Sequence, residues 1–321
     1  MKPLILFISI FSIICEVDIL KQQKIVNEVN ELKTTWTAEL NQKEIEVIPL
    51  DYLEQPKNLD IPLKTKFSKE LSDLPESFDL RDKFPNCETL KEIRDQSKCG
   101  SCWAFGSVET MSDRICIYSD QKLQTRLSAL HLISCCDTCG NGCFGGYPSS
   151  AFDYWKRKGI PSGGNYNDKS TCKPYFLPPC EDHPNKCIDY VDTPNCEDKC
   201  QDEYPIPLNE DLNFAKEIYS ISGEENIMKE IYTEGPVATL MIDFTDFSSY
   251  KTGIYQHVTG EACGIHCIKI IGWGVENGIK YWIMQNSWGE NWGEKGYFRM
   301  LRGTNECGIE SMAYAGIPKF E

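Results

Sequence analysis

The sequence predicts an α+β fold in which a helical half is followed by a β-rich half. Apolar residues recur at helical spacing over residues 101–118, and alternating apolar and polar residues dominate after Ser220. Between them lies a stretch rich in Gly, Pro, Cys and Asn, which predicts loops over residues 137–208. Because the two halves must meet at an interface, we expect a cleft there.

The bulk composition is that of a globular protein with acidic charge. The chain has 321 residues, of which 41% are hydrophobic, so it can bury a substantial core. Its formal net charge is -15 at pH 7, and no long run of Lys or Arg interrupts it. We therefore expect no nucleic acid among its partners.

The first residues, MKPLILFISIFSIIC, combine one lysine with a short apolar run. This run is too short to span a bilayer comfortably and has the form of a secretory signal peptide, which we assign to residues 1–15. A buried strand or helix is the alternative, but no turn residue or polar face accompanies the run. The mature protein should then be free of the membrane and should have passed through an oxidising compartment.

Cysteine is the most unusual feature of the composition, with 17 residues in the chain. After a secretory signal these cysteines indicate disulfides rather than zinc ligands. There are only four histidines, and none stands at a zinc-finger spacing from a cysteine pair. We expect no metal and no cofactor.

Residues 16–73 are rich in Lys, Glu and Gln and contain an apolar stripe. The stripe predicts an amphipathic helix that docks on another surface, and its members are Ile25, Val29, Leu32, Trp36 and Leu40. Composition alone leaves two interpretations open: an ordinary helix of the main domain, or a removable pro-segment.

From Leu74 the chain changes to a proline-punctuated extended stretch, LPESFDLRDKFPNC. A helix is predicted over Ser101 to Tyr118, with its apolar side formed by Trp103, Phe105 and their helical neighbours. Strands are predicted in the stretches GPVATLMIDF, GIHCIKIIGWG, KYWIMQNSW and GYFRMLRG.

The stretch RDQSKCGSCWAF holds Cys99 and Cys102 at a spacing that allows a redox pair, half of a zinc site, or a bridge cysteine beside a nucleophile. Cys102 lies at a predicted helix start, where the helix dipole favours a thiolate. His266 and Asn286 lie on consecutive predicted strands and provide a base with an amide that orients it. Gln96 and the backbone N–H of Cys102 could stabilise an oxyanion.

These motifs resemble those of the papain family of cysteine proteases, whose signature includes CGSCW. His266 and Asn286 lie further downstream than the family spacing of about 130–150 residues, so an insertion must separate them from Cys102. The insertion, CKPYFLPPCEDHPNKC, resembles that of the cathepsin B branch. The same likeness runs through LPESFDLRD, SDRICIY, CFGGYP, YQHVTGE and CGIES.

The resemblance implies a papain-like two-lobe fold, with a helical left lobe, a β-barrel right lobe and the active-site cleft between them. It implies that Cys102 is the nucleophile, His266 the base and then the acid, Asn286 its orienting group and Gln96 the oxyanion donor. It also implies the domain boundaries: a signal at 1–15, a propeptide at 16–73, and a protease domain at 74–321 with an occluding-loop-like insertion at about 172–200.

The resemblance also implies the disulfides. The implied pairs are Cys87–Cys116, Cys99–Cys143, Cys135–Cys196, Cys136–Cys139, Cys172–Cys200 and Cys180–Cys187. Cys263, Cys267 and Cys307 are left over. An extended chain would hold Cys263 and Cys267 beyond the about 7 Å that a disulfide can span, so we expect free thiols there.

Substrate contacts are carried over in the same way. The implied substrate-binding residues are Gly145, Gly146, Pro148, Cys267, Trp288, Met312 and His183. Trp288 would shield the His266–Asn286 contact. Ile265 stands where the family has a glycine, directly before His266, and this bulkier side chain should narrow either the primed side of the cleft or the S2 wall.

Two departures from the family predict altered specificity. Met312 stands where cathepsin B has the glutamate that accepts arginine at P2, so we expect an apolar P2 preference. Asp182 precedes His183 and would face Asp95, beside the catalytic motif. This like-charge contact disfavours closure of the insertion and predicts weak or absent peptidyl-dipeptidase activity.

The sequence thus predicts a cysteine-type peptidase, a cathepsin B-type endopeptidase made as a secreted zymogen. The alternative is a catalytically inactive binding protein on the same scaffold. Expected partners are protein and peptide substrates, the chain's own propeptide and cystatin-like inhibitors, and we expect a monomer. The chain should reach a lysosome or acidic vacuole, or the extracellular space.

Overall fold

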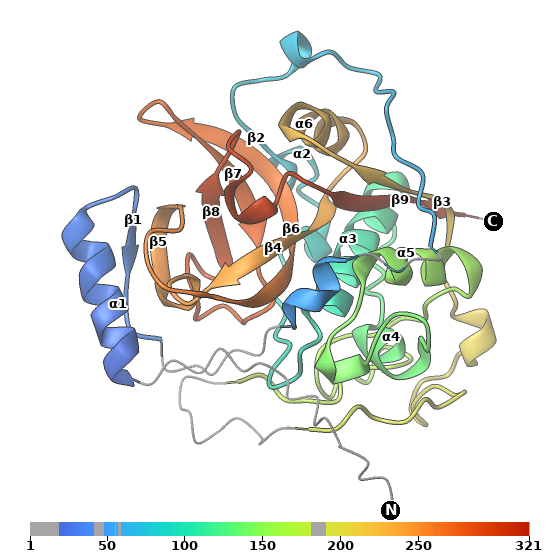
Figure 1. Ribbon diagram of the computed structural model, residues 1–321. Helices are drawn as coiled ribbons and strands as arrows, with labels where there is room; N and C mark the ends of the chain where they lie inside the picture. The colour runs from blue at the N-terminus through green and yellow to red at the C-terminus, as the bar shows by residue number, and fades with distance from the viewer. Residues whose placement is uncertain (1–18, 42–47, 55, 57–58, 181–190, 321) are drawn as a thin grey trace, which may run out of the picture.

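The computed structural model describes residues 19–41, 48–54, 56, 59–180 and 191–320, and Figure 1 draws the remainder in grey. The predicted signal segment therefore lies outside the described residues. No helix within the described ranges is long and apolar enough to cross a membrane.

The strands form one open, mostly antiparallel sheet. Along the hydrogen-bonded path the order is β1-β5-β8-β7-β6-β4-β9-β3, β2 pairs with β6, and β5 runs parallel to β8. The strands are β1 (Trp36–Ala38), β2 (Phe78–Asp79), β3 (Phe214–Ile221), β4 (Val237–Phe244), β5 (Tyr250–Tyr255), β6 (Ala262–Glu276), β7 (Ile279–Gln285), β8 (Tyr297–Leu301) and β9 (Ala313–Lys319). The path has two ends, so the β half is a curved open sheet rather than the closed barrel we expected.

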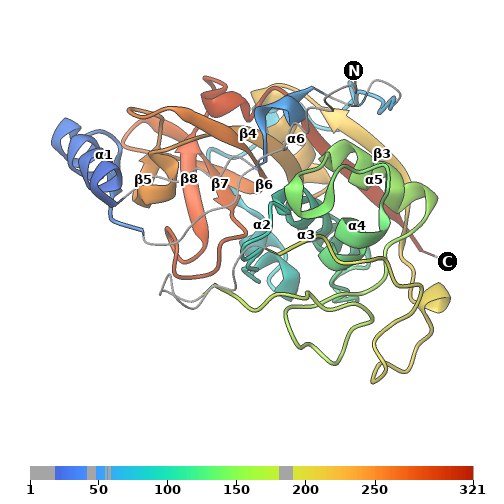
Figure 2. The same cartoon turned by 60° about the horizontal axis from the view of Figure 1, so that its bottom comes forward.

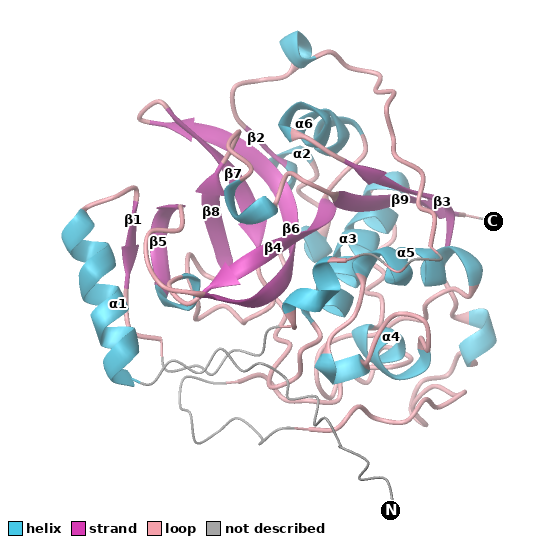
Figure 3. Cartoon of the chain, in the orientation of Figure 1, coloured by secondary structure: helices cyan, strands magenta, loops and turns pink. Residues whose placement is uncertain are grey.

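Two hydrophobic cores correspond to the two predicted halves. One lies among the strands and is built around aromatic side chains such as Trp273, Trp282 and Phe298. The other surrounds helix α3 (Cys102–Tyr118) and includes Trp103, Phe105 and residues of α4 (Ala129–Cys135) and α5 (Pro148–Arg157). Figure 3 shows helices α3 to α5 gathered on one side and most strands on the other. The predicted α+β, two-lobe fold is confirmed.

Helix α3 is the central element, because it packs against both halves. Its side chains are buried along almost the whole length, and its closest strand neighbour is β6. The shorter helices α2 (Leu80–Lys83) and α6 (Glu224–Thr233) cover other parts of the sheet. The prediction of loops over 137–208 missed α5. Its first residue is a proline, which signals a loop but is tolerated at the first position of a helix.

The N-terminal region differs from the predicted continuous helix. Helix α1 (Ile19–Leu32) ends before Lys33, whose φ of 49° is incompatible with a right-handed helix. Trp36 therefore lies in β1, pairs with β5 and donates from its indole N–H to the Gln256 carbonyl at 2.9 Å. Figure 1 shows α1 and β1 lying beside β5 at one end of the sheet, and Figure 2 shows α1 beside β5 from a second direction.

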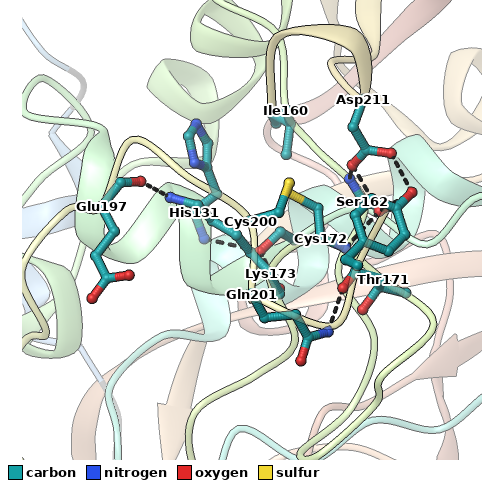
Figure 4. The surroundings of a disulfide bond; sticks show 12 residues. His131, Ile160, Ser162, Thr171, Cys172, Lys173, Glu197, Cys200, Gln201 and Asp211 are labelled. Atoms are coloured by element: carbon teal, nitrogen blue, oxygen red, sulfur yellow. Dashed lines mark hydrogen bonds between the residues drawn. A yellow bond between two sulfur atoms is a disulfide. The ribbon is translucent and has the colours of Figure 1, made fainter. Parts of the chain in front are cut away.

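Five of the implied disulfides are present, and they hold the loops of the helical half. These are Cys87–Cys116, Cys99–Cys143, Cys135–Cys196, Cys136–Cys139 and Cys172–Cys200. Around Cys172–Cys200 the Cys172 N–H donates to the Ser162 hydroxyl at 2.9 Å, and that hydroxyl donates to Asp211 at 2.7 Å (Figure 4). The base of the insertion is thereby fixed to the helical half.

The remaining cysteines require one correction. Cys180 is disulfide-bonded, but its implied partner Cys187 lies outside the described residues. Cys263 is also disulfide-bonded, so the expectation of a free thiol there was wrong. That expectation excluded only a bridge between Cys263 and Cys267 and did not consider another partner for Cys263. Cys267 and Cys307 are free, as expected.

A buried group of charges ties α3 to β6. The Lys269 ammonium lies 2.5 Å from the Asp113 carboxylate, and both side chains are fully buried. Glu109, one helical turn before Asp113, lies in the same region, and its Oε1 has no hydrogen-bond partner. Burial raises the pKa of Glu109 to about 7, although Lys269 and Arg94 act in the opposite direction. A carboxyl group with a raised pKa binds its proton more tightly in the folded state than in the unfolded state.

This raised pKa predicts a pH-dependent effect of Glu109→Gln on stability. The unfolded side chain titrates near pH ~4.3, so wild-type Glu109 costs nothing below that pH and destabilises the fold increasingly up to about pH 7. Glutamine does not ionise, and the variant should gain roughly 3 kcal/mol relative to wild type at pH 7.5 and almost nothing at pH 4. Urea unfolding at both pH values measures this. If the difference in unfolding free energy between the variant and wild type were the same at pH 4 and pH 7.5, the prediction would be contradicted.

Candidate active site

The thiol of Cys102 stands at the first residue of α3, which is the helix start that the sequence predicted. Cys99 is bonded to Cys143, so the two cysteines of CGSC are neither a redox pair nor zinc ligands, and Cys102 is free. Cys102 is completely buried, and burial raises the pKa of its thiol to about 12. The backbone N–H groups of Cys267 and Trp103 favour the thiolate, but more weakly.

His266 and Asn286 form a direct contact at the edge of the β half. His266 lies on β6, and Asn286 follows the last residue of β7, the antiparallel neighbour of β6. His266 Nε2 is 2.7 Å from Asn286 Oδ1, which also accepts from the Ser287 N–H at 2.8 Å. Because an amide oxygen only accepts, Nε2 carries the hydrogen and Nδ1 is left as the basic nitrogen.

The surroundings of His266 keep its ring neutral. Trp288 lies against the imidazole, with ring centroids 4.6 Å apart. Burial lowers the pKa of His266 to about 4, and the bond to Asn286 only partly opposes this. Nδ1 is buried and has no hydrogen-bond partner among the described residues. Both Cys102 and His266 are therefore uncharged near neutral pH in this form of the chain.

Gln96 is held rigidly beside the start of α3. Its Nε2 donates to the Cys99 carbonyl at 3.1 Å, and its Oε1 accepts from the Ser287 hydroxyl at 2.7 Å. Its backbone N–H donates to the Ser287 carbonyl at 2.9 Å. The amide nitrogen carries two hydrogens, and the bond to Cys99 uses one of them. Sequence reasoning missed Ser287, whose only signal is its position next to Asn286.

Residues 48–52 of the N-terminal region cover this site. The Ile48 N–H donates to the Ile265 carbonyl at 3.2 Å, and the Ile265 N–H donates to the Ile48 carbonyl at 2.9 Å. Ile265 is fully buried where it pairs with this segment, and its effect on the cleft of the processed enzyme stays a prediction. The Ile48 side chain is buried in the core of the helical half. Sequence reasoning had not singled out Ile48, although it lies in the apolar stretch VIPL.

The same segment contacts the loop that precedes α5. The Tyr52 ring lies 4.7 Å from that of Tyr147, measured between centroids. Gly145 has a φ of 117°, and a Cβ there would approach Tyr52 to 2.9 Å and Ile48 to 3.2 Å. Only glycine fits such a position. Figure 1 shows the short helix at residues 50–53 lying between the strands and the helices of the two halves.

The other implied substrate-binding residues come from α5, β6 and the start of β9. Pro148 is the first residue of α5 and is buried, and the Cys267 sulfur lies against Gly106 of α3. Met312 is 41% exposed, and the Tyr314 hydroxyl lies 3.1 Å from its sulfur. Tyr314 is buried in the same core as Cys267, and sequence reasoning missed it. Gly146 packs on the Trp103 ring. His183 lies outside the described residues.

This arrangement defines the class of papain-like cysteine peptidases. It has a cysteine at the start of a helix in one lobe, and a histidine on a strand with an asparagine bonded to it in the other. Residues 74–317 match the profile of the family described as papain family cysteine protease. The chain belongs to this family.

Its relatives give a narrower placement. The cathepsin B-like cysteine proteinase 6 of Caenorhabditis elegans is 43% identical over 324 residues, which covers 92% of this chain and 83% of that protein. A cathepsin B-like cysteine proteinase of Schistosoma japonicum is 48% identical and covers 77% of this chain and 74% of that protein. The structure of procathepsin B S9 from Trypanosoma congolense has a TM-score of 0.79 and 36% identity, over 95% of this chain and 99% of that one. The chain is therefore a cathepsin B-like cysteine peptidase.

The fixed position of Gln96 generates a prediction for the processed enzyme. If its amide stabilises the oxyanion, Gln96→Ala should lower kcat about 100-fold or more. Ser287→Ala should cost only about fivefold, because Gln96 keeps its bond to Cys99 while losing one neutral hydrogen bond. Steady-state kinetics on a dipeptide amide substrate measures both, with thermal unfolding as the control for folding. Equal kcat values in wild type and Gln96→Ala would show that the Gln96 amide does not stabilise the oxyanion.

Proposed function

We propose that the chain is the zymogen of a cysteine endopeptidase, with residues 1–15 as signal, 16–73 as propeptide and 74–321 as the catalytic domain. The observation that supports this most is the position of residues 48–52. They pair with the backbone of Ile265, which precedes His266, and they lie against Gly145, while Cys102 and His266 are both fully buried in this form of the chain. A segment bound in this way excludes substrate from the thiol until it is removed.

In the proposed mechanism His266 Nδ1 takes the proton of Cys102, and the thiolate attacks the peptide carbonyl. The Cys102 N–H and the Gln96 amide stabilise the oxyanion. His266 then donates its proton to the leaving amine, and a water molecule, deprotonated by the same nitrogen, hydrolyses the acyl-enzyme. Asn286 keeps the ring in the required tautomer through its 2.7 Å bond to Nε2.

Endopeptidase activity should dominate over release of C-terminal dipeptides. This proposal rests on the acidic Asp182 beside His183, both of which lie outside the described residues. Three further expectations also stay predictions. They are passage through the secretory pathway to a lysosome, an acidic vacuole or the exterior, inhibition by cystatin-like proteins, and a monomeric state. The inactive binding protein is the rival, and it is excluded if the processed chain hydrolyses peptides.

Zymogen behaviour is tested by acid treatment of the full chain. The pKa of His266 is about 4 when covered, against an ordinary value of 6.5. A depressed imidazole pKa means that covering is most favourable above pH 6.5 and weakens as the pH falls towards 4. We expect inactivity at pH 7, and loss of the segment near Leu74 with gain of activity at about pH 4.5.

Mass spectrometry and a peptidase assay on the same sample measure this. Cys102→Ala is the matched control and should stay uncut under the same conditions. A long peptide substrate should yield internal fragments rather than successive dipeptides. Full activity of the uncleaved chain at pH 7 would contradict the proposed zymogen.

Substrate preference at P2 is tested at Met312. A thioether offers no countercharge, so a buried arginine at P2 would be left unpaired, and peptides with Phe-Arg should be cleaved better than those with Arg-Arg. Met312→Glu should raise kcat/KM on Arg-Arg substrates at least about tenfold, or roughly 1.4 kcal/mol of transition-state binding. Met312→Gln is the uncharged control and should gain little. Equal cleavage of both substrates by wild type would exclude this role.

A further inference from the structure

Two free thiols stand together at the start of α3. Cys102 and Cys267 are both free and buried, whereas the other free cysteine of the described chain, Cys307, lies elsewhere in the β half beside Glu306. The Cys267 sulfur lies against Gly106, where an added Cβ would approach it to 2.7 Å. Gly106 is one helical turn after Cys102, so both residues face the same side of α3.

The two cysteines are neighbours across the contact between α3 and β6. The backbone N–H of Cys267 favours the Cys102 thiolate, and Cys102 in turn raises the pKa of Cys267. The Cys267 sulfur and carbonyl lie against Gly106, four residues after Cys102 on α3. A Cys102–Cys267 disulfide requires Cα atoms about 4.4–6.8 Å apart and rotation of the Cys267 side chain from Gly106 towards Cys102.

We propose that Cys267 is a resolving thiol for Cys102, so that oxidation by a peroxide ends in a reversible Cys102–Cys267 disulfide. The proposal rests on the proposed function, because it requires the reactive thiolate of the processed enzyme. It assigns to Cys267 a redox role in addition to its place beside the substrate.

The chemistry balances with hydrogen peroxide as oxidant. The Cys102 thiolate attacks one peroxide oxygen, the O–O bond breaks, and the products are Cys102 sulfenic acid and, after protonation, water. The Cys267 sulfur then attacks the sulfenic sulfur, an S–S bond forms, and the hydroxyl group leaves as water with the Cys267 proton. Two thiol groups of a reductant reverse the oxidation by exchange. The disulfide removes the nucleophile but prevents further, irreversible oxidation of Cys102.

The different environments of the two thiols suit these roles. Cys102 has the helix start and His266 to favour its thiolate once the segment is gone. Burial and the neighbouring Cys102 raise the pKa of Cys267 well above its ordinary value. Cys267 is thus protected from direct attack by peroxide and reacts only when a sulfenic acid forms beside it.

The test uses processed enzyme in three forms: wild type, Cys267→Ala and Cys307→Ala. Each is treated with a small excess of hydrogen peroxide, and peptides are analysed by mass spectrometry without reduction. Wild type and Cys307→Ala should yield a linked Cys102–Cys267 peptide that is lighter by two hydrogens. Activity is also measured before oxidation and after dithiothreitol, as a fraction of each protein's own starting value. After dithiothreitol, wild type and Cys307→Ala should regain nearly all of their peptidase activity. Cys267→Ala should regain at least about fivefold less, because its Cys102 is oxidised further to sulfinic acid.

Sulfinic acid on Cys102 with reduced Cys267 in wild type would overturn the proposal, as would equal recovery in wild type and Cys267→Ala. Cys267→Ser provides a second variant if Cys267→Ala does not fold, and the linked peptide in wild type is informative without either. Absence of peptide hydrolysis before oxidation would instead contradict the proposed function. The linked peptide is read by mass and does not depend on activity.

Discussion

The burial of Cys102 and His266 in the full chain, where residues 48–52 pack against neighbouring residues, is the constraint on which the chemistry of this chain depends. Desolvation penalises charge on both groups, so it raises the pKa of the thiol to about 12 and lowers that of the imidazole to about 4. The two pKa shifts have opposite directions but the same consequence, because both keep the Cys102 thiol and the His266 imidazole uncharged. When solvent returns, the helix start and the neighbouring imidazole both favour a thiolate. Removal of one segment can therefore switch the site on without rearranging it.

The architecture permits such a switch because the two lobes are fastened together independently of the segment. The fully buried Asp113–Lys269 pair joins α3 to β6 behind the cleft. Breaking one partner of a buried ion pair is strongly destabilising, so this contact fixes the relative position of the two elements. Lys269 is three residues from His266 on β6, and Asp113 lies on the same helix as Cys102. The core thus fixes the positions of Cys102 and His266, and in the proposed zymogen the segment controls only their exposure.

Local patterns in the sequence predicted the elements that carry the site. The helix that begins at Cys102 and the strand of His266 follow from apolar periodicity, which burial in a core enforces. Trp36 was misplaced because the left-handed Lys33 ends its helix, and a single backbone angle leaves no periodic signal. The open ends of the sheet depend on pairing between strands far apart in sequence, which no local pattern encodes.

The pH dependence of Cys102 alkylation, compared between the full chain and the processed enzyme, tests most directly whether the covered site holds Cys102 as a neutral thiol. Iodoacetamide reacts with thiolates, so its rate reports the fraction of ionised thiol and its exposure. We predict a processed enzyme that already reacts fast at pH 5–6, as expected for a thiolate–imidazolium pair, and a full chain that reacts at least about 100-fold more slowly at the same pH. Equal rates at pH 6 would show that residues 48–52 do not control the ionisation of the site.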